Sequence, residues 1–160
     1  MIPRSVKNFL GEQHVAYSVL PHRPAYTAQE EAAAAHVPGH RWAKTVACVG
    51  DQRPLLAMVP ASAFVDFDRL RKIAGVQEIR LASEREFEPL YPDCEVGAMP
   101  PLGPLYGQPV FVDRSLASGD IVFDAGSHTD AIKVRYDDFA RAVHPTVGDF
   151  GRTRRILTGQ

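Results

Sequence analysis

The chain has 160 residues, of which 45% are hydrophobic and 23% are charged, and its formal net charge is −1. This length allows one domain with a sizeable core, and the composition excludes a disordered chain. The near-neutral charge excludes a general attraction to nucleic acid or to anionic membranes, so any nucleic-acid contact has to be local.

The cysteine pattern and the N-terminal sequence indicate where the protein works. Cys48 and Cys94 form no CxxC pair and are too few for a disulfide framework, so we expect reduced thiols. The polar residues near the N-terminus leave no room for a signal peptide, and the longest apolar stretch, 55–59, is too short to span a bilayer. We therefore expect a cytoplasmic protein with no membrane partner.

The first quarter of the chain predicts two helices and a strand. Ser5 is placed to cap a short helix, and residues 15–20 alternate as a half-buried strand does. Thr27 and Glu30 then form the pattern of a capping box before an alanine-rich helix. Pro38 with the following glycine is expected to end that helix.

The rest of the chain alternates short strands with a few helices. Strands are predicted over 44–50, 54–60, 77–82, 108–113, 120–126 and 130–135, and helices over 66–75, 83–91 and 136–143. The tail from 148 onward carries three arginines and is expected to fray. Because regular strand–helix–strand alternation is absent, the pattern predicts one α+β domain over residues 1–160 with a mixed or antiparallel sheet.

Several kinds of catalytic or metal site can be set aside from motif spacing. His36 and His40 are four residues apart, but Pro38 lies between them and prevents a helix from holding that spacing, so we expect a solvent-facing pair and no metal. The chain has no GxSxG elbow and no Walker motif. Nothing near Cys94 indicates an activated thiolate.

Lys44 begins the strand over 44–50 and shares one strand face with Val46 and Cys48. One interpretation is a lysine that extends its amine from the strand end to water. The other is a cation at the mouth of a pocket, placed to bind an anion. The sequence leaves both open, the first being the commoner fate of such lysines.

A loop over 97–109 is unusual in composition, because seven of its thirteen residues are glycine or proline and none is charged. Prolines offer only carbonyl groups and lose little entropy on ordering, whereas Gly97 allows a ligand to approach the backbone closely. The loop is therefore either a tight packing segment or a rigid main-chain cradle for a ligand.

The turn within 125–132 is the third candidate. It contains Gly126, Ser127, His128 and Thr129 between two predicted strands. A plain polar turn is the default interpretation. His128 is also a residue type that can donate a hydrogen bond to a ligand or carry a proton.

Four segments together resemble the YbaK/prolyl-tRNA-synthetase-associated deacylase family. They are HRPAYTAQE with Thr27, WAKTVACV with Lys44, VGAMPPLG with Gly97 and Pro101, and FDAGSHTDAIKVRYDDFARAV at the end. The resemblance runs from about Val15 to Val143. It rests on the order and spacing of these segments.

The resemblance implies a fold, an activity and a site. The fold would be α+β, with a mostly antiparallel, barrel-like sheet surrounded by helices. The activity would be trans-editing, the hydrolysis of the ester between a wrong amino acid and the terminal ribose of a tRNA. The family's strand lysine falls on Lys44, its GxxxP loop falls on Gly97, Ala98, Met99, Pro100 and Pro101, and no metal or other cofactor is implied.

The same resemblance places Thr27, the loop residues 98–101 and the turn residues Gly126, Ser127 and His128 around the substrate, with Lys44 and Gly97 in the catalytic roles. An aminoacyl ester is already activated, so positioning a water could suffice, with the ribose 2′-hydroxyl moving the proton. Lys44 would pair with phosphate or a nearby oxygen, and the Gly97 backbone would orient the water or ribose. The partner would be the 3′ end of an aminoacyl-tRNA.

Departures from the family pattern leave the substrate open. Pro100 stands where the family commonly has a small hydroxyl residue, and Leu20 and Ala131 stand where the cysteinyl-tRNA branch has Tyr and Asp. This weakens a cysteinyl assignment and leaves alanine, serine, threonine or another small amino acid, with proline tRNA as one carrier. Two other functions stay open: a non-catalytic module that binds the tRNA end or a synthetase, and a hydrolase of another activated ester or amide.

Overall fold

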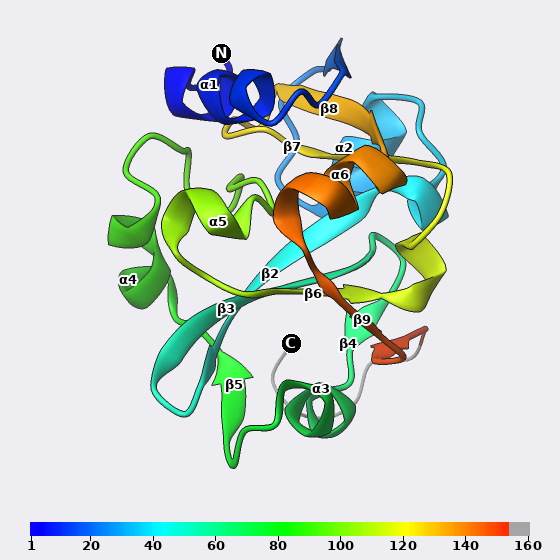
Figure 1. The fold of residues 1–160 in the computed structure, drawn as a ribbon. Helices are drawn as coiled ribbons and strands as arrows, with labels where there is room; N and C mark the ends of the chain where they lie inside the picture. The colour runs from blue at the N-terminus through cyan, green and yellow to red at the C-terminus, as the bar shows by residue number, and fades with distance from the viewer. Residues whose placement is uncertain (154–160) are drawn as a thin grey trace.

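Strands distant in sequence pair with one another in the computed structural model of the protein, which describes residues 1–153 (Figure 1). The strands are β1 (Tyr17–Pro21), β2 (Ala43–Gly50), β3 (Arg53–Pro60), β4 (Phe64–Val65), β5 (Ile79–Leu81), β6 (Val110–Asp113), β7 (Asp120–Asp124), β8 (Asp130–Arg135), β9 (Thr146–Gly148) and β10 (Gly151–Arg152). All seven strands predicted from the sequence are present, and the short β4, β9 and β10 were not predicted.

The described strands form three sheets, of five, three and two strands. In the largest, with the order β5-β2-β3-β6-β9, β2 pairs antiparallel with β3 and β5, whereas β6 pairs parallel with β3 and β9. The second sheet, β1-β8-β7, and the pair β10-β4 are antiparallel. The predicted mixed, mostly antiparallel α+β fold is therefore confirmed.

The expected barrel-like closure is wrong. Within residues 1–153 the five-stranded and three-stranded sheets meet at a single isolated bridge between Trp42 and Val122, so the strands do not close into one cylinder. Alternation of apolar residues shows which faces of a strand are buried, but it does not show whether the last strand of one sheet finds a partner in the next.

Six α-helices surround the sheets in the described part of the chain. They are α1 (Arg4–Glu12), α2 (Ala28–Ala34), α3 (Phe67–Ala74), α4 (Glu84–Phe87), α5 (Gly103–Tyr106) and α6 (Tyr136–Val143), with 3₁₀ turns η1 (Gly39–Arg41), η2 (Glu88–Leu90) and η3 (Arg114–Leu116). In Figure 1, α1 lies near β7 and β8 at one end of the molecule, and α3 lies near β5 at the other. No helix in this described part combines the length and the apolar character that crossing a membrane requires.

Helix starts follow the capping residues read from the sequence, with one exception. Thr27 and Asp66 accept hydrogen bonds from the first turns of α2 and α3, and Ser83 forms a complete capping box with Glu86. Ser5 is not a cap, because α1 begins one residue earlier behind Pro3 and the Ser5 hydroxyl donates to Asp93 instead.

The tail is ordered as far as the structure describes it. Residues Gly151–Arg152 pair with β4, and the Arg152 guanidinium forms an ion pair with the buried carboxylate of Asp66. The predicted fraying is therefore wrong up to residue 153. The other two tail arginines, Arg154 and Arg155, lie outside the described residues.

Candidate active site

A cavity of about 480 Å³ opens where α2, the start of β2, the loop at Gly97 and the end of β7 come together. Its walls are formed by Tyr26, Thr27, Ala28, Gln29, Glu31, Trp42, Ala43, Lys44, Thr45, Ala61, Phe64, Gly97, Met99 and Asp124. Four of the residues assigned to the site from the sequence, Thr27, Lys44, Gly97 and Met99, line this one cavity. They come from three segments that are distant in sequence.

Lys44 is held at the cavity wall. Its strand neighbour in β3 is Val59, and its Nζ donates a hydrogen bond of 2.7 Å to the carbonyl oxygen of Ala63. The same Nζ lies 4.8 Å from the centroid of the Phe64 ring. Partial burial lowers the pKa of the amine. Because an ammonium has three donors, the bond to Ala63 anchors Lys44 and leaves hydrogens for a ligand.

Gly97 presents bare backbone to the cavity. Its φ is +84°, a conformation that residues with side chains rarely adopt. The Gly97 N–H donates no hydrogen bond to any group within residues 1–153, whereas the next N–H, of Ala98, donates to Glu95. An unused donor at a left-handed glycine is suited to a ligand oxygen.

Residues 98–103 of the loop pack into the core, which explains why this part of the loop carries no charge. Of the GxxxP segment, Met99 lines the cavity, whereas Ala98, Pro100 and Pro101 are buried without lining it. Farther on, Leu102 is 1% exposed and α5 begins at Gly103, where an added Cβ would meet the Gln108 carbonyl oxygen at 2.2 Å. The loop therefore contains a packing segment, and its residues Gly97 and Met99 line the cavity, where the alternative expectation placed a ligand.

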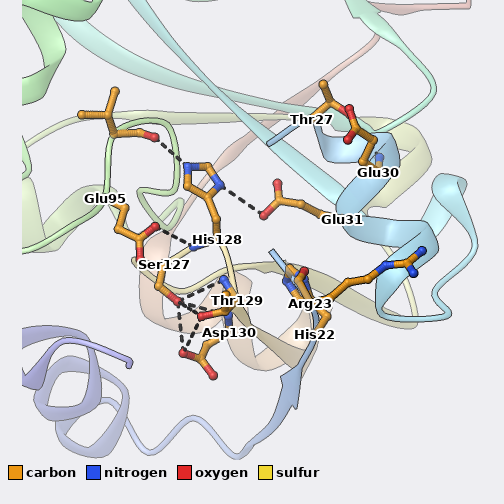
Figure 2. Close-up of polar contacts among 11 residues, drawn as sticks. His22, Arg23, Thr27, Glu30, Glu31, Glu95, Ser127, His128, Thr129 and Asp130 are labelled. Atoms are coloured by element: carbon orange, nitrogen blue, oxygen red, sulfur yellow. Dashed lines mark hydrogen bonds and ion pairs between the residues drawn. The ribbon is translucent and has the colours of Figure 1, made fainter. Parts of the chain in front are cut away.

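His128 lies beside Gly97, where an added Cβ would be 3.8 Å from its ring. Figure 2 shows its contacts with Glu31 and Glu95. Its Nε2 is 2.7 Å from the Val96 carbonyl oxygen, its Nδ1 is 3.5 Å from Glu31 Oε2, and its backbone N–H donates to Glu95. The ring also packs against Tyr26, with centroids 5.2 Å apart. The residue is 8% exposed and lies behind the cavity wall without lining it.

Gly126 and Ser127 lie behind the cavity wall and do not line it. Gly126, with a φ of +106°, donates its N–H to Ala98 and leaves no room for a Cβ beside Pro3. The Ser127 hydroxyl donates to Asp130, which also pairs with the N-terminal amine at 2.7 Å. Both residues therefore hold the turn that carries His128.

Two acidic residues that sequence analysis did not single out form part of the cavity wall. Glu31 is 3% exposed and Asp124 is 9% exposed. Burial, together with a hydrogen bond between the two carboxyl groups, raises the pKa of Glu31 to about 10. Burial likewise raises the pKa of Asp124. In the sequence Glu31 reads as one of two glutamates in an exposed helix, so composition gives no signal of its burial.

The two cysteines and the pair His36 and His40 add no reactive group to the cavity wall. Burial raises the pKa of the Cys48 thiol to about 12 and also raises that of Cys94, so neither is an activated nucleophile. His36 and His40 are both exposed. Within residues 1–153, the group whose donor atoms are close enough for a metal ion is His22, Glu31 and Asp124.

The comparisons with known proteins identify the family. The sequence matches the model of the aminoacyl-tRNA editing domain over residues 22–142. The structure resembles that of the hypothetical protein APE2540, with 19% identity, a TM-score of 0.83 and coverage of 93% of this chain and 100% of that one. It also resembles a proposed trans-editing enzyme for prolyl tRNA synthetase, with 21% identity, a TM-score of 0.76 and coverage of 92% and 94%.

At these identities the structural likeness establishes the fold, and no curated protein matches the chain significantly. The family match is independent of the structure and spans residues 22–142, which contain every side chain that lines the cavity. The chain therefore belongs to the aminoacyl-tRNA editing domain family.

Proposed function

We propose that the protein is a free-standing trans-editing hydrolase that removes a small, wrongly attached amino acid from tRNA. The observation that carries the proposal is that Lys44 and Gly97, from separate segments, line the same cavity. Its volume of about 480 Å³ falls within the ~300–1,000 Å³ usual for small-ligand pockets. The substrate would be met in the cytoplasm, and only the 3′ end of the tRNA would enter.

The proposed reaction is hydrolysis of the aminoacyl ester. A water adds to the ester carbonyl carbon, the bond from that carbon to the ribose oxygen breaks, and the water's proton passes to the leaving oxygen. The neighbouring ribose hydroxyl can relay that proton, so no protein general base is required. The ester is already activated, so holding the water and the carbonyl in the right geometry supplies much of the rate.

Lys44 would act by charge. With its amine anchored on the Ala63 carbonyl, it cannot swing freely into solvent, and its remaining hydrogens would bind a phosphate oxygen or the developing negative charge on the ester oxygen. A fixed donor costs no reorganisation when charge develops, which is why such groups contribute strongly to rate.

Gly97 would act through its backbone. Its unpartnered N–H is the donor that would orient the water or the ribose, and the absent side chain lets the substrate approach. Met99 and Thr27 would form the walls of the amino-acid pocket. Ala98, Pro100, Pro101, Gly126, Ser127 and His128, which do not line the cavity, would contribute by holding the Gly97 backbone and the turn beneath it.

A panel of mischarged tRNAs tests the proposal. The purified protein is incubated with tRNAs carrying alanine, serine, threonine, cysteine or proline, and released amino acid is measured. Proline tRNA is the first carrier to test, because a structural relative is described as a proposed trans-editing enzyme for prolyl tRNA synthetase. Faster release of at least one small amino acid than in buffer is the expected result.

The same assay separates the alternatives. Binding of the tRNA, or of a synthetase, without release of any amino acid would contradict hydrolysis and support a binding module. Hydrolysis of simple activated esters with all aminoacyl-tRNAs left intact would support a different hydrolase.

A further inference from the structure

Four buried side-chain atoms at the cavity wall or behind it have no hydrogen-bond partner, although two of them, Glu31 Oε2 and His128 Nδ1, lie 3.5 Å apart as an ion-pair contact. They are His22 Nε2, Glu31 Oε2, Asp124 Oδ1 and His128 Nδ1, and they are all such atoms found within residues 1–153. Glu31, Asp124 and His128 are each more than nine-tenths buried. A buried polar atom without a partner costs free energy, so four at one place indicate a ligand that would satisfy them.

In each of the two histidines, the hydrogen bond made by one ring nitrogen determines whether the other ring nitrogen is a donor or an acceptor. His22 Nδ1 is 2.9 Å from the Arg23 carbonyl oxygen, and His128 Nε2 is 2.7 Å from the Val96 carbonyl oxygen (Figure 2). A carbonyl only accepts, so each of these nitrogens must carry the hydrogen. In a neutral imidazole the other nitrogen then offers a lone pair. Two lone pairs and two carboxyl groups therefore point toward one small region.

The spacing of these atoms is of the size found around one small cation. The donor atoms of His22, Glu31 and Asp124 lie within 4.8 Å of one another, and His128 Nδ1 is 3.5 Å from Glu31 Oε2. Acceptors hydrogen-bonded at about 2.9 Å to a tetrahedral nitrogen stand roughly 4.7 Å apart. Ligands at about 2.1 Å from a tetrahedral zinc ion would stand only roughly 3.4 Å apart. The upper limit of 4.8 Å allows the ammonium spacing for His22, Glu31 and Asp124, whereas the 3.5 Å between Glu31 and His128 is closer to the zinc spacing, so zinc is the competing occupant that the experiment has to test.

The cluster also faces the cavity. Glu31 and Asp124 line the same space as Lys44 and Gly97, so the cavity has a cationic group on one element and acidic groups on two others. An aminoacyl ester has matching polarity, because its carbonyl and phosphates attract a cation and its α-ammonium attracts an anion. Without a ligand the acidic pair keeps a proton, since burial and Asp124 raise the pKa of Glu31 to about 10.

Resting on the proposed function, we propose that Glu31 and Asp124, supported by His22 and His128, bind the free α-ammonium of the aminoacyl group. The site thereby requires an unblocked amino acid. It excludes N-acylated esters, including peptidyl and formylated ones, because an acyl group removes the charge and two of the nitrogen's hydrogens. Losing one buried charged partner typically costs on the order of a 10- to 100-fold drop in affinity.

Stable substrate analogues test this without requiring turnover. Adenosine amides carrying alanyl, propionyl or N-acetylalanyl groups on the 3′-nitrogen are titrated into the protein by calorimetry. The propionyl compound keeps the shape of the alanyl one and lacks only the amino group. We expect the alanyl analogue to bind at least about 10-fold more tightly than either of the others.

Single substitutions test which residues produce the preference for the alanyl analogue. Glu31→Gln and Asp124→Asn are each expected to bring the alanyl-to-propionyl ratio close to one. Glu30→Gln, on the same helix, and Asp120→Asn, on the same strand, serve as exposed controls and should keep the wild-type ratio. Because the first comparison uses wild-type protein alone, a variant that misfolds does not decide the outcome.

Three results would overturn the inference: equal affinity for the alanyl and propionyl analogues, no binding of any analogue, or stoichiometric Zn²⁺ retained after dialysis by wild type and lost in Glu31→Gln. The proposed function fails separately. Alanyl preference without hydrolysis of any mischarged tRNA would contradict deacylation and uphold ammonium binding, whereas hydrolysis that ignores N-acetylation would do the reverse.

Discussion

Gly97 has a φ of +84°, and a Cβ added there would meet the His128 ring at 3.8 Å. That distance is ordinary contact, so an alanine would fit sterically but would strain the backbone. A larger side chain would also project beside the cavity and displace the substrate. The constraint on this residue is therefore of two kinds, conformational and functional, and the two can be separated.

We expect Gly97→Ala to lose about 1 kcal/mol of stability from the left-handed φ and Gly97→Val to lose deacylation as well. Gly107→Ala is the matched control, because Gly107 has a φ of +68° and open space around its Cβ, away from the cavity. Urea unfolding and single-turnover deacylation measure the two effects. Wild-type rates in Gly97→Val would remove the loop backbone from the mechanism.

We expect Glu31 to make the free energy of unfolding of the protein depend on pH. Its pKa rises from 4.5 to about 10 on folding, because of burial and then the bond with Asp124. The folded state therefore binds more protons than the unfolded state between these values, and its stability falls as pH rises through that window. Glu31→Gln removes this proton and should flatten the dependence.

Unfolding free energies of wild type and Glu31→Gln, measured in urea from pH 5 to pH 9, check this prediction. The stability of the variant relative to wild type should increase steadily with pH. Parallel curves for the two proteins would show that Glu31 is already ionised in the folded state at neutral pH.

At the scale of elements, helix α2 and its N-cap supply two residues of the cavity wall, Thr27 and the acidic Glu31. Its N-cap Thr27 accepts a hydrogen bond from the Glu30 N–H and lines the cavity, and Glu31 follows within the first turn. The cap therefore sets where α2 begins and how Glu31 enters the cavity wall. The sequence predicted this cap correctly, because hydroxyl residues before an alanine-rich stretch are a local signal.

Thr27→Ala should cost about 1 kcal/mol of stability and slow deacylation, and Thr27→Ser should restore most of both. Ser83→Ala removes the cap of α4, whose residues do not line the cavity, so it should lose similar stability with no change in rate. Equal rates for Thr27→Ala and wild type would limit Thr27 to a structural role.

At the scale of the whole molecule, the features that could be predicted depend on local sequence signals. The features that could not be predicted depend on contacts between residues distant in sequence. The seven longer strands, the caps Thr27, Asp66 and Ser83, and the glycine at position 97 could be predicted, because each depends on a few neighbouring residues. The open arrangement of three sheets could not, because it depends on which strand edges meet, as at Trp42 and Val122. The acidic pair could not be predicted either, since Glu31 and Asp124 become neighbours only through folding.

The most direct test of the account is the single-turnover rate of mischarged tRNA hydrolysis by Lys44→Ala. Lys133→Ala, which removes an exposed lysine from β8, is the matched control, and circular dichroism checks that both variants fold. The account predicts a loss on the order of 100-fold or more for Lys44→Ala and a wild-type rate for Lys133→Ala. A wild-type rate in a folded Lys44→Ala would contradict it.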